Sequence, residues 1–448
     1  MYRKFYILFV LFAMILSCSD DDEFTSNPSS RLTFSVDSVL MDTVFSTVGS
    51  STYSFWVFNN NDEGIRLPVV RLRSGNQTGF RVNVDGSYLD NQLGSVVTDL
   101  EVRAGDSIRV FVELTASENG KDEAQRLEDN LIFKLESGVE QSICLRAFVW
   151  DAYQVGYLHI TSDTTISTHK PIVVYGSILV DSATTLTLHN TKLFFHDKAG
   201  LDIHGTLNAD SCLFRGDRLD HMFDYLPYDF VSGQWRGLHF YASSTGNMMQ
   251  ACEIRNPETG IQLDSAAIDT TALPRITLQN SIIHNCKGPG IEAFNATIDL
   301  RYCQVTNTLG DCVALYGGSA SLLNCTLAQF YPFSAERGAA LRFSNFSTND
   351  TACPLEQLFC ANSILTGYPD DVLTGERKDD AVAFNYYFEN CLLKTPADDD
   401  TLHFSNIIWE EKTDTTMGKK LFRLIDETNL RYDFHIDTLS VAKGLGCY

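Results

Sequence analysis

The stretch RITLQNSIIHNCKGPGIEAFNA (Arg275 to Ala296) is followed by TIDLRYCQVTNTLGDCVALYGG (Thr297 to Gly318) and SASLLNCTLAQF (Ser319 to Phe330), and the three lines repeat one pattern. With a period of 22 residues, similar residues fall into columns: Leu278, Leu300 and Leu322; Ser281, Cys303 and Cys325; Ile283, Val305 and Leu327. A fixed period of this length is typical of a solenoid, in which each repeat adds one coil.

The short alternating runs in these lines favour strands over helices. Leucine-rich repeats have periods in the same range, but each repeat needs a helix or its equivalent on the outer side. The runs ITLQNS and IDLRYCQV are broken by Asn and Gly, which is the pattern of strand, turn and strand. Three short strands in each 22-residue coil predict a parallel β-helix, whose inward side chains stack about 4.8 Å apart.

Two asparagines mark a turn of the predicted coil. Asn285 and Asn307 each come just after a strand and lie 22 residues apart. Asn tolerates the left-handed backbone conformation and bonds locally in turns. We therefore expect the two side chains to stack as a ladder that satisfies their own amides.

The first 17 residues have the pattern of a signal peptide. Arg3 and Lys4 precede an apolar run from Phe5 to Leu16, which is too short to favour a membrane span. Cys18 ends the pattern and looks like the lipidated first residue of a bacterial lipoprotein, which would attach the protein to a membrane. The alternative is an ordinary cleavage site with an incidental cysteine. Residues 18–30, which include the run SDDDE, form the expected acidic tether.

Charge and cysteine content limit the partners and the cross-links. The formal net charge of −23 makes nucleic acid and anionic lipid poor partners. Of the 12 cysteines, one is Cys18, which leaves the odd number of 11. Disulfides are the minority interpretation, and Cys353 with Cys360 is the first pair to test. Five others recur in a strand motif and are expected to be small inward-facing residues: Cys212, Cys252, Cys303, Cys325 and Cys391.

Residues 31–151 differ in kind from the repeats. Seven alternating runs are separated by turn clusters: LTFSVDSV, STYSFWVFN, RLPVVRLR, FRVNVDG, DSIRVFVEL, NLIFKLES and QSICLRAFVW. Seven short strands in this length predict an immunoglobulin-like β-sandwich. Trp56 and Phe58 are expected to face its core.

Residues 152–448 are assigned to the β-helix, which begins near Tyr157. After the first coils, a strand motif recurs at Cys212, Cys252, Ser281, Cys303, Cys325, Ser363, Cys391 and Ile407. Gaps longer than 22 residues indicate loop insertions or extra coils. The main insertions are Gly216 to Gln234, Pro257 to Pro274, Gln329 to Gln357 and Gly367 to Asp380.

Several segments resemble a known group of proteins. They are GLDIHGTLNADSCLFRGDRLDHMFDYLPYDFVSGQWRGLHF (200–240), NCTLAQF (324–330), AFNYYFENCLLK (383–394) and YDFHIDTLSVAKGLG (432–446). They look like Bacteroidetes right-handed parallel β-helix lipoproteins of the pectin-lyase-like fold group. The resemblance implies a right-handed coil and an outer-membrane location facing the cell exterior, with the acidic run after Cys18 similar to a surface-export signal. It implies little about activity, because fold does not determine function.

Catalytic residues are sparse in the regular coils. A hydrolase needs two carboxyl groups about 5 to 9.5 Å apart, and a lyase needs a base beside a cation that neutralises a uronate. Glu292 aligns with Gln262 and Ala314, so no column of carboxylates runs through the coils. The remaining candidates lie in or just after one insertion: Asp217, Asp220, His221 and Arg236. The alternative is a polar loop without chemistry.

Sugar binding needs less, since aromatic faces stack on pyranose rings. Tyr225, Tyr228 and Trp235 of the same insertion are the candidate platforms, although each one alone is better explained as cladding of the coil. The spacing of His189, His196 and His204 does not predict a zinc site, and the acidic turns 379–380 and 398–400 leave calcium as a possible cofactor. Two function classes remain: a surface-anchored binding or scaffold protein for glycans or outer-membrane proteins, and a polysaccharide lyase or glycoside hydrolase.

Overall fold

The computed structural model describes residues 23–221, 227–267, 273–410 and 420–448. The chain forms two compact units, Met1–Asp151 and Ala152–Tyr448. The signal peptide, Cys18 and the acidic run predicted from the sequence lie outside the described residues. Within the described ranges, no helix has the length and apolar character needed to cross a membrane.

The described part of the first unit is a sandwich of two five-stranded sheets. One sheet has the order β1-β3-β8-β5-β6, with β1 Thr33–Phe34, β3 Tyr53–Phe58, β8 Ser107–Leu114, β5 Phe80–Val84 and β6 Ser87–Tyr88. The other has the order β2-β10-β9-β4-β7, with β2 Ser38–Phe45, β10 Glu140–Trp150, β9 Gln125–Lys134, β4 Ile65–Leu72 and β7 Val96–Val102. A short 3₁₀ turn, Asn91–Leu93, precedes β7.

Alternating side chains of these strands build the sandwich core, as expected for sheets with one buried face. On β3, Phe55 and Val57 are buried in this core. The expectation that Trp56 faces the core is wrong, because the inward positions of the strand are its two neighbours. The Trp56 ring is 41% exposed, and the guanidinium of Arg109 lies 5.2 Å from the ring centroid. The aromatic run YSFWVF fits either register, so the strand pattern alone does not select the inward set.

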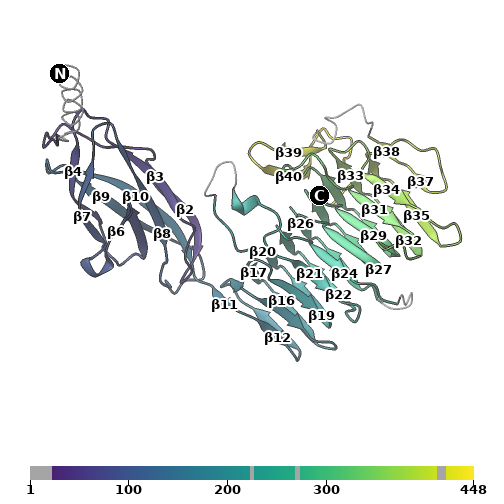
Figure 1. Ribbon diagram of the computed structural model, residues 1–448. Coiled ribbons are helices and arrows are strands. Elements are labelled where there is room, and N and C mark those ends of the chain that lie inside the picture. Colours follow the sequence, from purple (N-terminus) through teal and green to yellow (C-terminus); the bar gives the residue numbers. More distant parts are fainter. Residues whose placement is uncertain (1–22, 222–226, 268–272, 411–419) are drawn as a thin grey trace, which may run out of the picture. The chain divides into compact units, whose positions relative to one another are not determined.

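The second unit is a parallel β-helix, so the predicted all-β class of a sandwich followed by a β-helix is confirmed (Figure 1). In the described residues each coil contributes one strand to an eleven-strand sheet. Its members are β11 Tyr153–Val155, β14 Ile172–Val174, β17 Lys192–Phe195, β20 Leu213–Gly216, β23 Glu253–Arg255, β26 Ile282–His284, β28 Gln304–Thr306, β30 Thr326–Gln329, β33 Ile364–Gly367, β36 Leu392–Leu393 and β38 Ile408–Trp409.

Within the described ranges, the first nine coils contribute two further strand segments each to a seventeen-strand sheet, and the tenth contributes one. The first segments are β12 Leu158–Ile160, β15 Ser177–Val180, β18 Gly200–Ile203, β21 Gly237–Phe240, β24 Ile261–Leu263, β31 Leu341–Ser344 and β34 Leu373–Glu376. The second segments are β13 Thr164–Ser167, β16 Thr185–His189, β19 Thr206–Asp210, β22 Asn247–Gln250, β25 Ile276–Gln279, β32 Leu355–Ala361, β35 Phe384–Glu389 and β37 Phe404–Ser405. Two long strands, β27 Ile291–Arg301 and β29 Val313–Leu323, supply both segments of their coils. We call the outward side of the first segments the first-strand face.

The predicted columns match the register of the coils. Leu278 pairs with Leu300, and Leu300 pairs with Leu322. Ile283, Val305 and Leu327 pair in the same way. These side chains are fully buried in one core that runs through the coils. Cys353 and Cys360 are free thiols. The five motif cysteines are also free and are buried, as expected from their column: Cys212, Cys252, Cys303, Cys325 and Cys391.

The asparagine turns are only partly as predicted. Asn285 and Asn307 have φ values of 60° and 54°, in the left-handed region. The Asn285 amide donates to Oδ1 of Asn256 at 2.7 Å, so a ladder exists between those two coils. It does not reach Asn307, whose two amide atoms are buried without a hydrogen-bond partner among the described residues. A longer ladder, Asn362, Asn390 and Asn406, occupies another corner of the coil.

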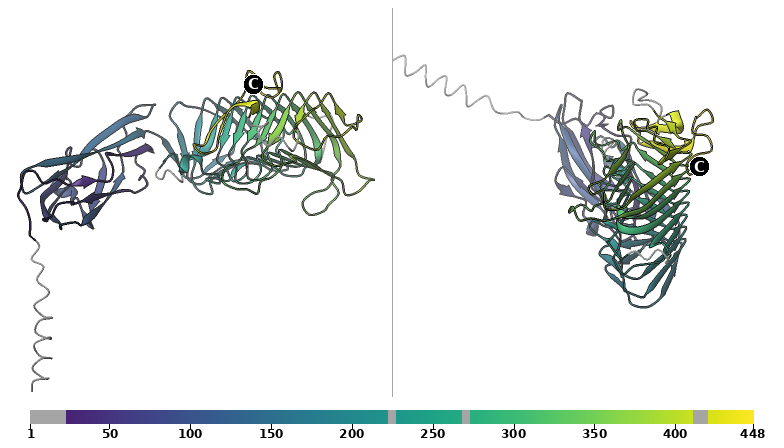
Figure 2. Two further views of the ribbon diagram at one scale, coloured as in Figure 1. Left: turned by 90° about the horizontal axis from the view of Figure 1, so that it is seen from above. Right: turned by 90° about the vertical axis from the view of Figure 1, so that its right-hand side faces the viewer.

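The chain ends outside the coil. A hairpin of β39 (Phe422–Asp426) and β40 (Arg431–Ile436) follows the last rung. Apolar residues of the hairpin and the chain end pack against the outer side of the eleven-strand sheet and form a separate cluster with it. The residues from the sheet and just after it are Ala328, Phe330, Ile364 and Leu392, and those from the C-terminal segment are Leu421, Phe422, Phe434, Ala442 and Leu445. Both views in Figure 2 show this yellow hairpin along the outside of the stacked rungs.

Candidate functional site

The insertion singled out by the sequence connects β20 to β21. Asp217 follows β20 directly, and Arg236 immediately precedes β21. A 3₁₀ turn, Tyr228–Phe230, lies in its second half. Tyr225 lies outside the described residues. The turn is tied to the coil by the asparagine ladder, because the Asn256 amide donates to the Asp229 carbonyl and the Asn285 amide to the Phe230 carbonyl, at 2.7 and 2.6 Å.

Charged groups of the insertion pair with neighbours in and next to it. Arg218 donates to both oxygens of Asp220, at 2.7 and 2.9 Å, and its guanidinium lies 3.8 Å from the ring centroid of Tyr228. His221 approaches Asp229 at 3.7 Å. The stacked guanidinium covers a face of Tyr228 that a sugar ring would need. These contacts hold the loop and leave little of its charge for a ligand.

Asp217 forms a separate pair with the coil. Its Oδ2 lies 2.7 Å from Nδ1 of His196. Burial nevertheless raises the pKa of Asp217, since desolvation outweighs the hydrogen bond from the imidazole. The pair ties the start of the insertion to the neighbouring coil.

Trp235 and Arg236 do not join the insertion's polar groups. Trp235 is 1% exposed and stacks on Phe195, with ring centroids 4.4 Å apart and planes at 8°. The expectation that it forms a stacking platform is wrong, because the ring fills the core at a corner of the coil. Arg236 forms a bidentate pair with Asp202 on β18, at 3.0 and 2.6 Å, and so lies on the first-strand face.

The first-strand face carries polar groups in register over many coils. From β18 to β34 the paired outward positions are Asp202, His239, Gln262, Glu292, Ala314, Arg342 and Thr374. His239 pairs with Asp264 at 2.8 Å and stacks on Tyr241 with centroids 4.0 Å apart. The face thus presents hydrogen-bonding groups and rings along the direction in which the coils stack.

A carboxyl cluster lies on this face around Glu292 and Asp311. Asp311 accepts the Ala339 N–H at 2.6 Å and the Arg342 Nε–H at 2.8 Å. Arg342 also donates to Glu376 at 3.0 Å. Ala314, between Glu292 and Arg342 in the column, carries only a methyl group. Ala314 is itself fully buried, so Glu292 and Arg342 lie on either side of a small, covered residue.

The two carboxyl groups of this cluster have different environments. Burial, with the negative charge of Asp311 as the second cause, raises the pKa of Glu292. Asp311, by contrast, accepts hydrogen bonds from a guanidinium and from a backbone N–H. A carboxyl group whose pKa is raised and that lies near a second carboxyl group is a candidate general acid.

Aromatic rings and a cavity adjoin the cluster. Phe294 and Tyr316 stack on neighbouring coils with centroids 5.0 Å apart and planes at 11°. Burial, and next the negative charge of Glu292, raises the pKa of Tyr316. Phe294 also lines an open cavity of about 410 Å³, whose other walls include Asp264, Asn295 and residues 347–349. The cavity falls in the size range of sites for small ligands.

Sequence reasoning missed this site. It aligned Glu292 correctly but looked only for acids in one column, whereas Asp311 precedes the strand that carries Ala314. For metals, no group of three or more potential ligands occurs in the described ranges. At the acidic turns, Asp380 pairs with Arg377 at 3.0 Å and Asp400 with His403 at 2.5 Å. Calcium binding there stays a prediction.

Comparison with known proteins identifies the coil. Residues 157–327 match the family described as right handed beta helix region, which confirms the predicted handedness. The chain is also similar to the crystal structure of the catalytic unit of a thermostable GH87 alpha-1,3-glucanase from Streptomyces thermodiastaticus strain HF3-3. The identity is 12% over 80% of this chain and 89% of that chain, with a TM-score of 0.26. At that TM-score the likeness says nothing about activity. No curated protein matches the chain.

Proposed function

We propose that this protein binds an extracellular polysaccharide along its first-strand face. The observation that carries the proposal is the stacked pair Phe294 and Tyr316, which lies between a cavity and the polar cluster of Glu292, Asp311 and Arg342. Aromatic faces bind pyranose rings, and polar groups beside them fix the hydroxyls. The regular rung spacing of about 4.8 Å suits a ligand that is itself a chain of repeating units.

The expected ligand is a neutral polysaccharide. The formal net charge is −23, so an anionic polymer approaches against repulsion. Arg342, the cation of the cluster, is already paired with Asp311 and Glu376. These two facts disfavour a uronate ligand and, with it, a lyase mechanism that needs a cation for the uronate carboxylate.

Binding to a panel of neutral and uronate polysaccharides tests this proposal. Phe294→Ala and Tyr316→Ala should each weaken binding about 2- to 12-fold, because a stacking ring contributes about 0.5 to 1.5 kcal/mol beyond area burial. Tyr387→Ala is the matched control, since Tyr387 stacks on Phe359 with planes at 5° but lies on the second strand segments. Equal losses in all three variants, or none, would remove the first-strand face as the binding site.

Hydrolysis of the bound polysaccharide is a second candidate function, favoured by the raised pKa of Glu292 beside Asp311. Glu292 in its neutral form donates its proton to the glycosidic oxygen as the bond to the anomeric carbon breaks. A water attacks that carbon and gives its proton to Asp311. The products are a new reducing end and a free hydroxyl, and the two carboxyl groups have exchanged their roles.

Release of reducing ends from neutral polysaccharides tests the second candidate. Glu292→Gln should lower the rate about 100-fold or more while binding persists, because a general acid contributes about 10² to 10⁴. Asp299→Asn is the control, since Asp299 lies on the same strand β27 but in its second segment, paired with Arg301. If the unmodified protein releases no reducing ends, or the Glu292→Gln protein keeps the full rate, hydrolysis is excluded and binding stands alone.

The proposal includes a lipid anchor and display on the cell surface. The signal-like run, Cys18 and the resemblance to Bacteroidetes β-helix lipoproteins support it. Cys18→Ala should release the protein from the membrane fraction. Replacing Asp20, Asp21 and Asp22 with Ala should keep the anchor but protect the protein from protease added to intact cells. Unchanged membrane retention of Cys18→Ala would rule out the anchor.

A further inference from the structure

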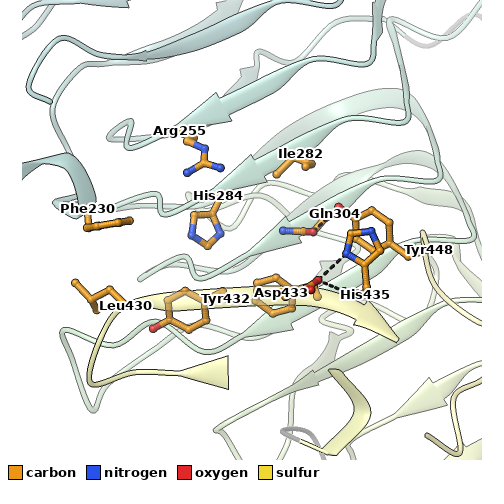
Figure 3. Close-up of a pocket in the computed structure, with 11 residues that line it drawn as sticks. Phe230, Arg255, Ile282, His284, Gln304, Leu430, Tyr432, Asp433, His435 and Tyr448 are labelled. Atoms are coloured by element: carbon orange, nitrogen blue, oxygen red, sulfur yellow. Dashed lines mark hydrogen bonds and ion pairs between the residues drawn. The ribbon is translucent and has the colours of Figure 1, made fainter. Parts of the chain in front are cut away.

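A second cavity lies between the eleven-strand sheet and the C-terminal hairpin. Its volume is about 230 Å³. Figure 3 shows Arg255, His284 and Gln304 on the side of the sheet, and Tyr432, Asp433 and His435 on the side of β40. None of these residues belongs to the first-strand face, so the cavity is a separate feature of the second unit.

The hairpin wall is held in place by packing. Phe434, which lines the cavity, also contacts Phe330 and Phe422 in the apolar cluster under the hairpin. At the chain end, Tyr448 stacks on His435 with centroids 4.0 Å apart and donates to Oε1 of Gln304 at 2.8 Å. The wall is thus attached to the sheet beside the cavity and at the chain end.

The sheet side presents a neutral imidazole. Nδ1 of His284 lies 2.8 Å from the Thr306 hydroxyl, and Nε2 has no hydrogen-bond partner among the described residues. Burial, and next the charge of Arg255, lowers the pKa of His284 to about 3. Arg255 itself is paired with Glu253. This wall therefore offers hydrogen-bonding nitrogens but little net charge.

The hairpin side presents an acceptor. Oδ1 of Asp433 accepts the His435 backbone N–H at 3.0 Å and lies 2.6 Å from Nδ1 of the His435 ring. Although burial opposes it, these hydrogen bonds keep the pKa of Asp433 low. Aromatic rings of Phe230, Tyr432 and Tyr448 line the same space. The cavity thus combines ring faces with donors and acceptors whose charges are compensated.

We propose that this cavity binds one neutral sugar ring, that of a free monosaccharide. Ring faces match the apolar side of a pyranose, and vicinal hydroxyls both donate and accept, as Asp433, His284 and Arg255 require. The volume lies just below the range of about 300 to 1,000 Å³ for larger ligands, so it suits a single ring. Compensated charges and the acidic chain disfavour an anionic sugar. The site does not depend on polysaccharide binding at the first-strand face.

Titration of the full mature protein with neutral methyl glycosides, N-acetylglucosamine and glucuronate tests the proposal. At least one neutral sugar should bind and should slow proteolysis of the hairpin. Asp433→Asn should weaken that binding about 10-fold or more, because a hydrogen bond to a charged acceptor is lost. Asp437→Asn is the matched control: Asp437 also accepts the N–H two residues on, at 2.9 Å, but does not line the cavity.

The outcomes separate this site from the proposed function. Tyr316→Ala should leave monosaccharide binding unchanged, and Asp433→Asn should leave polysaccharide binding unchanged. The thermal midpoints of Asp433→Asn and Asp437→Asn show whether both fold. If no neutral sugar binds at millimolar concentration, if glucuronate binds more tightly than its neutral counterpart, or if the two folded variants bind alike, the inference is wrong.

Discussion

The first-strand face and the insertion from Asp217 to Arg236 carry the same kinds of side chain but use them differently. In the insertion, Arg218 holds Asp220 and covers Tyr228, while Trp235 fills the core. On the first-strand face, burial beside Asp311 raises the pKa of Glu292, and a stacked aromatic pair adjoins a cavity. The polar groups of the insertion pair with one another, whereas the first-strand face holds a carboxyl group whose pKa is raised by its surroundings.

This difference shows that residue types do not locate a site without the register. Several acids, bases and rings in one loop suggest chemistry, yet a loop must also satisfy its own charges and backbone groups when it docks. The face draws its groups from coils far apart in the sequence, and the repeat brings them together. If the insertion is structural and the face is functional, substitutions in the insertion should change stability and substitutions on the face should change binding.

Trp235→Ala should have the largest effect on stability. Removing a fully buried Trp leaves a cavity beside Phe195 and should lower the free energy of unfolding by about 3 to 5 kcal/mol. Urea unfolding measures this. Tyr228→Ala, in the same insertion but only partly buried, should cost clearly less. If the Trp235→Ala protein were as stable as its parent, Trp235 would not be buried in the core and would again be a candidate platform for sugar stacking.

Asn285→Ala should come next, and Asn307→Ala should cost less. Asn285 donates to Asn256 and to the Phe230 carbonyl, so its loss should cost about 1 to 3 kcal/mol and loosen the insertion. Asn307 makes no such bond in the described structure, so Asn307→Ala should cost about 1 kcal/mol or less, from the left-handed turn alone. Thermal unfolding with proteolysis of the insertion reports both effects. Equal costs would mean that the ladder extends through Asn307.

The regular rungs were predictable because one physical rule fixes them. A 22-residue coil repeats its inward positions, so Leu278, Leu300 and Leu322 could be stacked by counting. The same counting fails where a coil is longer. Val313 pairs with Leu341, 28 residues on, so the 22-residue period does not place Arg342 opposite Ala314. The inward direction of the Trp235 side chain could not be predicted for a similar reason. Trp235 lies at the end of an insertion, where the 22-residue period does not say which side chains face the core.

The pH dependence of stability should distinguish Glu292 from its Gln variant. Since the folded state raises the pKa of Glu292 above its ordinary value of 4.5, protonation favours folding. This contribution is complete below the unfolded pKa and is lost as pH rises through the folded pKa. The stability of the parent relative to Glu292→Gln should therefore fall as pH increases from about 4 toward neutral. Urea unfolding at several pH values measures the difference, and a pH-independent difference would mean that Glu292 is not buried beside Asp311.

Asp220→Asn should have the smallest effect on stability. Any change in polysaccharide binding would therefore report on the insertion as a binding site and not on loss of folding. The Asp220 carboxylate accepts two bonds from Arg218, but that guanidinium is 40% exposed and water can replace the lost bond. The expected cost in stability is about 1 kcal/mol or less. Polysaccharide binding should change less than about two-fold, because RT ln 2 is about 0.4 kcal/mol and the first-strand face is untouched. Tyr228→Ala should leave binding equally unchanged, since Arg218 already covers that ring. If either variant lost polysaccharide binding ten-fold while Phe294→Ala bound normally, the insertion and not the first-strand face would be the binding site.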